Sequence, residues 1–260
     1  MHCPYDPPEP YAQRFRTRPV EDEVATQGRC GRDFDRMALS RAQGRFISDR
    51  YDAGIRYADD LLQAFLTRLE SSGTLGDTLI VVLSDHGEQF LEHGHVGHHD
   101  TQYMEVLRIP WVMAGPGLEP RVVGEPVGLA DVMPTLLDLL GLPAPPSAGA
   151  SLAPVLRRSA AEQRVRPLFS ESDWRVRLRS AVVGDYHLIA NPAATEIFDW
   201  RADPLEQRNI LGEDPQRDAR LQRELAGHLA ESSREESTSA GKVELDEAER
   251  RRLHALGYVD

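Results

Sequence analysis

A long amphipathic helix followed directly by a continuous apolar strand constrains the fold of this chain more than any other feature. Between residues 49 and 69 apolar side chains recur with the helical period, and Gly73 stands where a helix would end. The next segment, "TLIVVLSD", is an unbroken apolar run without polar alternation, typical of a central parallel strand covered on both faces. A helix that leads into such a strand predicts an α/β layer.

The rest of the chain extends this layer and then adds a smaller unit. "RIPWVMAGPGL" predicts a second strand closed by a turn, and "VGLADVMPTLLDLLGLP" predicts a loop and a helix. Residues 168–200 alternate like antiparallel strands joined by turns. We therefore expect an α/β fold, part of a mixed, mainly parallel sheet flanked by helices, followed by a small α+β antiparallel subdomain. The expected units are an α/β part over 1–155, the small subdomain over 165–231, and a linker with a charged terminal helix over 232–260.

Charge disfavours nucleic acid as a partner, and hydropathy argues against a transmembrane segment. Acidic residues number 42 against 30 basic ones, and the net charge of -12 disfavours nucleic acid as the main ligand. No stretch approaches the roughly 18 consecutive apolar residues of a transmembrane helix, so we expect no transmembrane segment in this chain. Cys3 and Cys30 could form one disulfide or none, and they leave the compartment undecided.

Histidines gather directly after the predicted strand, with five of the nine between residues 86 and 99. In a parallel sheet, ligand chemistry collects where the strands end, and Asp85 and His86 lie at that edge. Gly87 permits a sharp turn that could bring both side chains toward one ion. A carboxylate beside an imidazole suits a divalent metal, with calcium, manganese and zinc all open.

A purely structural interpretation competes with this one. An Asp-His-Gly turn can simply cap a helix, and a histidine-rich loop can bind metal adventitiously. For one isolated histidine the structural interpretation would be favoured, but five histidines beside a strand-end aspartate favour a functional site. Imidazoles on such a loop can donate to an anionic oxygen or act as acid or base near neutral pH. We interpret Glu88, Glu92 and Glu105 as loop or helix-start carboxylates.

Three motifs, in order, resemble the second half of the catalytic domain of sulfatases, in the alkaline-phosphatase-like superfamily. They are "TLIVVLSDHGEQFLEHG", "YMEVLRIPWVMAGPG" and "LADVMPTLLDLLGLP". In addition, "MHCPYDPPEPY" is similar to the family's P-H-x-P-Y-x-P-P segment, and "GDYHLIANPAATEIFDWRADPLEQRNIL" to its carboxyl-terminal subdomain. The resemblance implies a sulfuric ester hydrolase that works with a bound metal.

The resemblance also implies roles for single residues. Asp85 and His86 match the paired metal ligands of the S-D-[NH]-G motif, where Ca²⁺ is the usual ion, with Mn²⁺ or Zn²⁺ as alternatives. His2 matches the histidine of P-H-x-P-Y, which holds a sulfate oxygen or assists the leaving group. The sulfate-binding position of the K-x-x-x-[YWF]-E segment falls on His99, or on His98 by comparison with other members, and the choice stays open. His2, His98 and His99 are thus the expected catalytic and substrate-binding residues.

The nucleophile that the family needs is not in this sequence. Sulfatases use a formylglycine made in a C-x-[PA]-x-R motif, which neither Cys3 nor Cys30 fits, and the family's early aspartate pair is absent too. We therefore expect a carboxyl-terminal portion, from a truncated gene model, a split gene or a degenerate gene. Its partner would be the missing amino-terminal half with the formylglycine. The full-length parent is expected to hydrolyse small sulfate esters or sulfated glycans, and this chain alone is expected to be inactive.

Two other functions stay open at this point. A phosphoryl or phosphonate ester hydrolase of the same superfamily is compatible with His86, since histidine in place of asparagine suits zinc or manganese. A non-catalytic remnant that binds a metal or a glycan is the third interpretation. The resemblance suggests a periplasmic or extracellular location, and it gives His93 and His95 no role.

Overall fold

The computed structural model describes residues 4–17, 24, 29, 32–157, 166–173, 176–238, 246, 247, 249 and 251. Among these residues the helices are α1 (Glu9–Phe15), α2 (Arg32–Asp35), α3 (Arg41–Ser71), α4 (Met104–Leu107), α5 (Val132–Leu139), α6 (Ala153–Leu156) and α7 (Pro215–Thr238), with 3₁₀ turns η2 (Leu75–Asp77) and η3 (Leu129–Asp131). The strands are β1 (Ile80–Leu83), β2 (Gln89–Phe90), β3 (Val96–Gly97), β4 (Trp111–Ala114), β5 (Leu168–Ser172), β6 (Leu178–Val183), β7 (Tyr186–Ala190) and β8 (Thr195–Asp199).

The predicted long helix is α3, and it begins earlier than its apolar period suggests. Ser40 and Gln43 form a capping box, in which the Ser40 hydroxyl accepts from the Gln43 amide at 3.2 Å and the Gln43 side chain accepts from the Ser40 amide at 3.0 Å. The helix ends at Ser71, and Gly73 follows with a φ of +74°, where glycine avoids the steric cost of left-handed backbone. The sequence prediction of the helix end is therefore confirmed.

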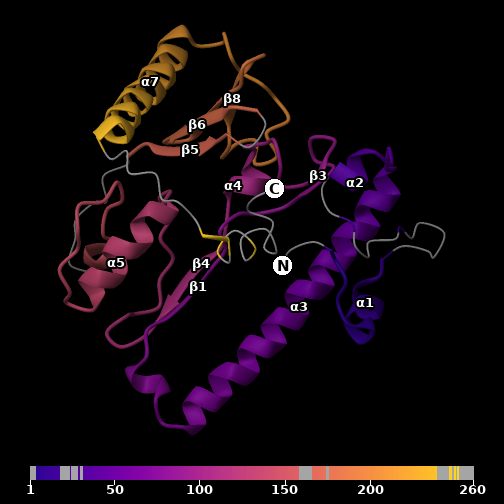
Figure 1. The fold of residues 1–260 in the computed structure, drawn as a ribbon, viewed down its shortest axis with the longest axis vertical. Helices are drawn as coiled ribbons and strands as arrows, with labels where there is room; N and C mark the ends of the chain where they lie inside the picture. The colour runs from indigo at the N-terminus through magenta and orange to yellow at the C-terminus, as the bar shows by residue number, and fades with distance from the viewer. Residues whose placement is uncertain are drawn as a thin grey trace.

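The two halves of α3 have different surroundings. The amino-terminal half contributes Phe46 and Ile47 to a buried cluster with Tyr5, Phe34 and Val96. Through Val96, this cluster packs the histidine-rich loop over residues 86–99 against the helix. In the carboxyl-terminal half, large apolar side chains are exposed instead, namely Leu61 and Phe65. Figure 1 shows α3 running along one side of the molecule with its carboxyl end far from the β5–β8 sheet.

The predicted strand "TLIVVL" forms β1, and its partner is β4. The two strands pair antiparallel, with Val81 opposite Met113. All sheets among the described residues pair antiparallel, so the parallel neighbour expected for β1 is not in the described part of the chain. An unbroken apolar run indicates that both faces of a strand can be buried. It does not determine whether the neighbouring strand is parallel or antiparallel.

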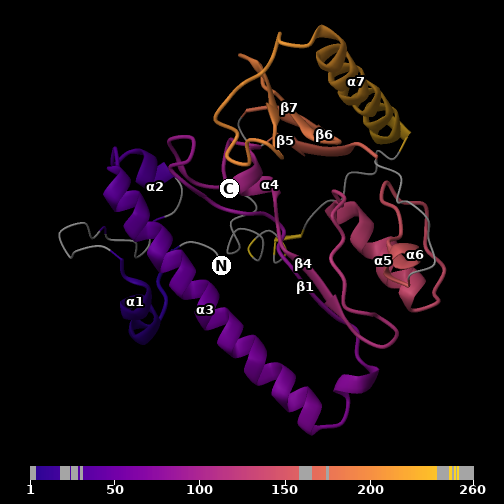
Figure 2. The same cartoon turned by 180° about the vertical axis from the view of Figure 1, so that it is seen from behind.

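A separate core lies in the carboxyl-terminal unit. Strands β5 to β8 form one antiparallel sheet in chain order, as predicted, and α7 covers one face of it (Figures 1 and 2). Ala181, Leu188 and Ile197 of the sheet pack with Leu221 and Leu225 of α7. The helix continues to Thr238, past the end expected from the sequence. The division of the chain at 155, 165 and 231 stays a prediction, and most of the expected terminal helix lies outside the described residues.

Within the described part of the chain, no helix combines the length and the apolar character that a bilayer span requires.

Candidate active site

The turn after β1 carries the Asp-His pair. The Ser84 hydroxyl donates to the His86 carbonyl at 2.6 Å, and the His86 amide donates to Asp85 Oδ1 at 3.0 Å. These two bonds reverse the chain directly at the strand end. As a result, two neighbouring side chains that a regular strand would send to opposite faces come together, with His86 Nε2 3.8 Å from Asp85 Oδ1.

Gly87 is required here by close packing of backbone against backbone. Its amide donates to the Val106 carbonyl at 2.7 Å, and the Glu88 amide donates to the Glu105 carbonyl at 3.0 Å. A Cβ at position 87 would lie 2.2 Å from the Glu105 carbonyl oxygen. These two backbone hydrogen bonds therefore hold the Asp85-His86 turn against α4, and only glycine fits at position 87.

The arrangement of Asp85 and His86 fits two ligands of a divalent cation. His86 Nδ1 lies 2.8 Å from the Gly87 carbonyl, which can only accept, so Nδ1 carries a proton. Whenever the ring is neutral, the lone pair is therefore on Nε2, the nitrogen facing Asp85. Slight burial raises the pKa of Asp85, but the charge of His86 and hydrogen bonds from backbone amides and Ser84 outweigh it and lower the pKa overall. The carboxylate is thus ionised at neutral pH.

Asp85 and His86 do not complete a metal site within the described part of the chain. There, no group of three or more His, Cys, Asp or Glu side chains converges in a way that could hold an ion. Asp85 and His86 therefore match half of a site, whose other ligands would come from elsewhere.

His98 lies beside the Asp-His pair, and the structure distinguishes it from His99. The rings of His86 and His98 are 4.0 Å apart between centroids. His98 Nδ1 donates to Glu88 Oε1 at 2.9 Å, and both side chains are largely buried, with 14% and 2% of their surface exposed. His99 is exposed, with its ring 4.5 Å from that of His98. The predicted His2 lies outside the described residues.

Glu88 is a site residue that sequence reasoning missed. We interpreted it as a loop carboxylate, yet its side chain is buried and holds the His98 ring through Nδ1. A carboxylate on Nδ1 fixes the tautomer and the orientation of the His98 ring. Nothing in the local pattern signals this, because the pairing depends on how the loop between the two residues folds.

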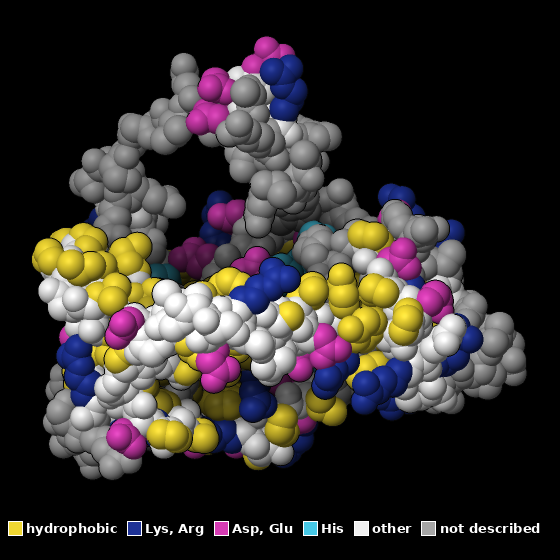
Figure 3. Space-filling model, turned by 90° about the horizontal axis from the view of Figure 1, so that it is seen from below, with side chains coloured by type: hydrophobic (Ala, Val, Ile, Leu, Met, Phe, Trp, Pro, Cys, Tyr) yellow, Lys and Arg dark blue, Asp and Glu magenta, His cyan; other side chains and the backbone are white. Residues whose placement is uncertain are grey.

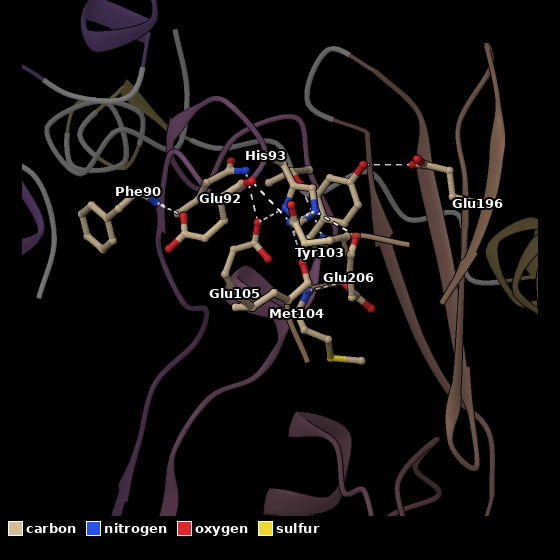
Figure 4. Close-up of polar contacts among 12 residues, drawn as sticks. Phe90, Glu92, His93, Tyr103, Met104, Glu105, Glu196 and Glu206 are labelled. Carbon is tan, nitrogen blue, oxygen red and sulfur yellow. Dashed lines mark hydrogen bonds and ion pairs between the residues drawn. The ribbon is translucent and has the colours of Figure 1, made fainter. Parts of the chain in front are cut away.

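His93 belongs to a second, partly buried cluster, which includes Tyr103, Glu105 and Glu206 (Figure 4). Its Nδ1 lies 2.6 Å from Glu105 Oε1, and its Nε2 lies 3.1 Å from the Glu206 carbonyl. The ring stacks on Tyr103 with a centroid separation of 3.5 Å, and the Tyr103 hydroxyl donates to Glu196 at 3.0 Å. Both ring nitrogens thus face acceptors, which suits the doubly protonated imidazolium. His95, by contrast, is an exposed residue paired with Asp35 at 3.2 Å.

We expect the stability of the chain to fall as the pH rises through the pKa of His93. Burial by itself lowers the pKa of His93, but hydrogen bonds to Glu105 and Glu206 and the charges of both raise it overall from the ordinary 6.5. Burial also raises the pKa of Glu105, while Tyr103 stays neutral because its pKa is raised too. A raised histidine pKa adds stability that is complete below about pH 6.5 and is lost as the pH rises through the folded-state value.

The measurement is urea unfolding from pH 5.5 to 8.5. Replacing His93 with Asn should remove about 1.5–3 kcal/mol at the acid end, the range for a hydrogen bond to a charged group, and less at the alkaline end. His95→Asn is the matched control, since that histidine lies on the same loop but is exposed. Equal pH slopes in both variants would contradict the assignment.

Comparison with known proteins shows the family of the chain. Residues 1–142 match the family model described as Sulfatase. The choline-sulfatase of Rhizobium meliloti (strain 1021) is 29% identical over 228 residues, which cover 82% of this chain and 40% of that protein. The solved structure of BT1596, a 2-O GAG sulfatase, is 25% identical with a TM-score of 0.65, covering 80% of this chain and 48% of that one.

A phosphonate monoester hydrolase from Silicibacter pomeroyi shares the fold, with a TM-score of 0.65 at 24% identity, covering 86% of this chain and 46% of that one. These neighbours have the alkaline-phosphatase-like fold, which confirms the predicted fold class. The chain belongs to the sulfatase family, a family of hydrolases that in general use a metal ion and a formylglycine. It spans less than half the length of each of the three proteins compared here.

Proposed function

We propose that the whole protein hydrolyses sulfate esters, with this chain supplying one side of the active site. The observation that carries the proposal is the meeting of Asp85, His86 and His98 at the end of β1, at positions that match the family motifs. Cleavage of a sulfate ester spreads negative charge over the sulfate oxygens and the leaving alkoxide, so a cation and imidazole donors stabilise the transition state.

In this proposal Asp85 and His86 are metal ligands, with Ca²⁺ as the ion and Mn²⁺ or Zn²⁺ as alternatives. When bound, the metal would stabilise the negative charge of the sulfate group. Between the two candidate sulfate-binding histidines, we favour His98, because Glu88 holds its ring next to His86. His99 and His2 remain candidates for contacts with the substrate. The substrate class is a small sulfate ester or a sulfated glycan, in line with the names of the choline-sulfatase and the 2-O GAG sulfatase.

The exposed apolar surface supports an amino-terminal sulfatase half as the partner of this chain. Val112 on β4 is 59% exposed, and Phe65 on α3 is 56% exposed. Among the described residues β1 and β4 pair only with each other, and a two-stranded sheet by itself is marginally stable in water. Figure 3 shows hydrophobic side chains grouped across the face seen from below. A polypeptide that corresponds to the unmatched half of the relatives would cover these groups.

The function is tested by completing the chain with an amino-terminal half that carries the C-x-[PA]-x-R cysteine converted to formylglycine. The assembled protein should release sulfate from 4-nitrophenyl sulfate in a metal-dependent way. The 260-residue chain alone should not exceed the metal-only blank, because it has no nucleophile. Sulfate release by the chain alone would contradict its inactivity, and assembly with metal binding but no hydrolysis would favour a non-catalytic role.

Matched substitutions control the assembly step. Val112→Lys places a charge on the proposed contact surface and should weaken assembly at least tenfold. Val122→Lys makes the same change at a side chain that is 96% exposed in a loop, and it should have no effect. Equal assembly of both variants would contradict the proposed surface.

A phosphonate or phosphate ester hydrolase is the second candidate, favoured by the fold shared with the phosphonate monoester hydrolase. The same assembled protein distinguishes the two when it is given a 4-nitrophenyl phosphonate ester. A larger kcat/KM for the phosphonate than for the sulfate would establish the second candidate and reject the first.

A further inference from the structure

A buried carboxylate, Glu206 on the loop after β8, connects the carboxyl-terminal unit to α4. Its Oε2 accepts from the Met104 amide at 2.8 Å, its Oε1 accepts from His187 Nδ1 at 2.7 Å, and its main-chain carbonyl accepts from His93 Nε2 at 3.1 Å. The side chains of Glu206 and His187 are fully buried. Figure 4 shows Glu206 beside Met104 and His93.

The backbone of Glu206 adopts a conformation that glutamate rarely takes. Its φ is +50°, in the left-handed region that is sterically unfavourable for a residue with a Cβ. Such a conformation persists where the surroundings fix it, and here three hydrogen bonds to separate segments do so. The contacts of Glu206 are therefore specific and are not a by-product of burial.

The other side of α4 holds the Asp85-His86 turn. Met104, the first residue of α4, is bound to Glu206, and the next two residues offer their carbonyls to the turn. The Glu105 carbonyl accepts from the Glu88 amide, and the Val106 carbonyl accepts from the Gly87 amide. Tyr103, immediately before the helix, is tied to the same carboxyl-terminal sheet through Glu196 on β8. One helical turn thus joins the sheet to the active-site turn.

We propose that Glu206 is a positioning residue, which holds α4 and through it the turn that carries Asp85 and His86. The carboxyl-terminal unit is then a structural support of the active site. The proposal rests on the proposed function for the identity of the active site, but the contacts themselves do not depend on catalysis. Removing the carboxylate leaves the Met104 amide without its acceptor and frees the amino end of α4, so the two hydrogen bonds to the turn open more often.

The test is hydrogen exchange of single amides, measured by NMR on the 260-residue chain without metal or substrate. In Glu206→Ala the amides of Gly87 and Glu88 should exchange at least tenfold faster than in the natural chain. Glu206→Gln should give an intermediate rate, because its amide oxygen can still accept from Met104 while its nitrogen donates to the other tautomer of His187. Amides of the β6–β7 ladder, such as Leu188, should keep their rates in both variants.

Glu213→Gln is the matched control, because Glu213 belongs to the same carboxyl-terminal part of the chain but is half-exposed and pairs with Arg208. In this variant the amides of Gly87 and Glu88 should exchange at the same rates as in the natural chain. Unchanged rates in a folded Glu206 variant would overturn the proposal. An equal rise at β6–β7 amides, or loss of folding in both variants, would also overturn it, because Glu206 would then support the whole fold. The exchange rates of the Gly87 and Glu88 amides do not depend on catalysis. If the assembled protein released no sulfate, that result would reject the proposed function and leave the role of Glu206 standing.

Discussion

Replacing His86 with alanine is expected to lower metal affinity and turnover together in the protein completed by an amino-terminal half. His86 Nδ1 is bound to the Gly87 carbonyl, so in the proposed site Nε2 would be the ligand atom, and alanine removes it without disturbing the backbone of the turn. Loss of a supporting residue around a metal typically lowers affinity or activity by roughly 10- to 100-fold, and loss of a ligand should cost at least as much.

The measurements are the Kd for Ca²⁺ by calorimetry and kcat for an aryl sulfate at saturating metal. His95→Ala serves as the control, since it removes a histidine of the same loop whose side chain is 63% exposed. His86→Asn should retain part of the affinity, because asparagine supplies an oxygen ligand. Unchanged metal content in His86→Ala would rule out the ligand role.

Replacing Gly87 with alanine is expected to destabilise the chain by about 2–4 kcal/mol, from overpacking and the loss of two backbone hydrogen bonds. The added methyl group would lie 2.2 Å from the Glu105 carbonyl oxygen, which cannot move away without breaking its own bond to the Glu88 amide. Both contacting groups are backbone, so a change of rotamer gives no relief. The Asp85-His86 turn should therefore separate from α4.

Urea unfolding at pH 7 measures this loss, and Gly76→Ala is its control. A Cβ at position 76 would meet no atom within 4 Å, so that variant should be as stable as the natural chain or slightly more stable. If Gly87→Ala matched Gly76→Ala in stability, the close approach of the turn to α4 would be wrong.

The elements that the sequence predicts well are those whose signals are local. The apolar period of α3 and the stop at Gly73 each depend on residues within one or two turns of chain. The earlier start of α3 also had a local signal, the capping box of Ser40 and Gln43, but charged residues and a glycine in the first turns weaken the apolar period there.

The contacts that sequence reasoning missed join residues far apart in the chain. His93 and Glu206 are separated by 113 positions, and no periodicity in a single sequence links them. The antiparallel pairing of β1 with β4 was missed for a similar reason, since an apolar run carries no information on strand direction. Asp85 and His86 could be named in advance because they are adjacent and follow a strand, whereas Glu88 needed the fold of the loop to bring His98 to it.

The double attachment of α4 limits how the length of this chain can vary in evolution. Between Tyr103 and Val106 each residue is bound to a fixed partner, on the β8 side or on the active-site turn. Inserting or deleting a single residue there would rotate the helical turn by about 100° and mismatch every bond at once. The segment over 116–127, which lies between regular elements and is largely exposed, carries no such constraint. Homologous chains should therefore differ in length over 116–127 and keep the spacing from 103 to 106 unchanged.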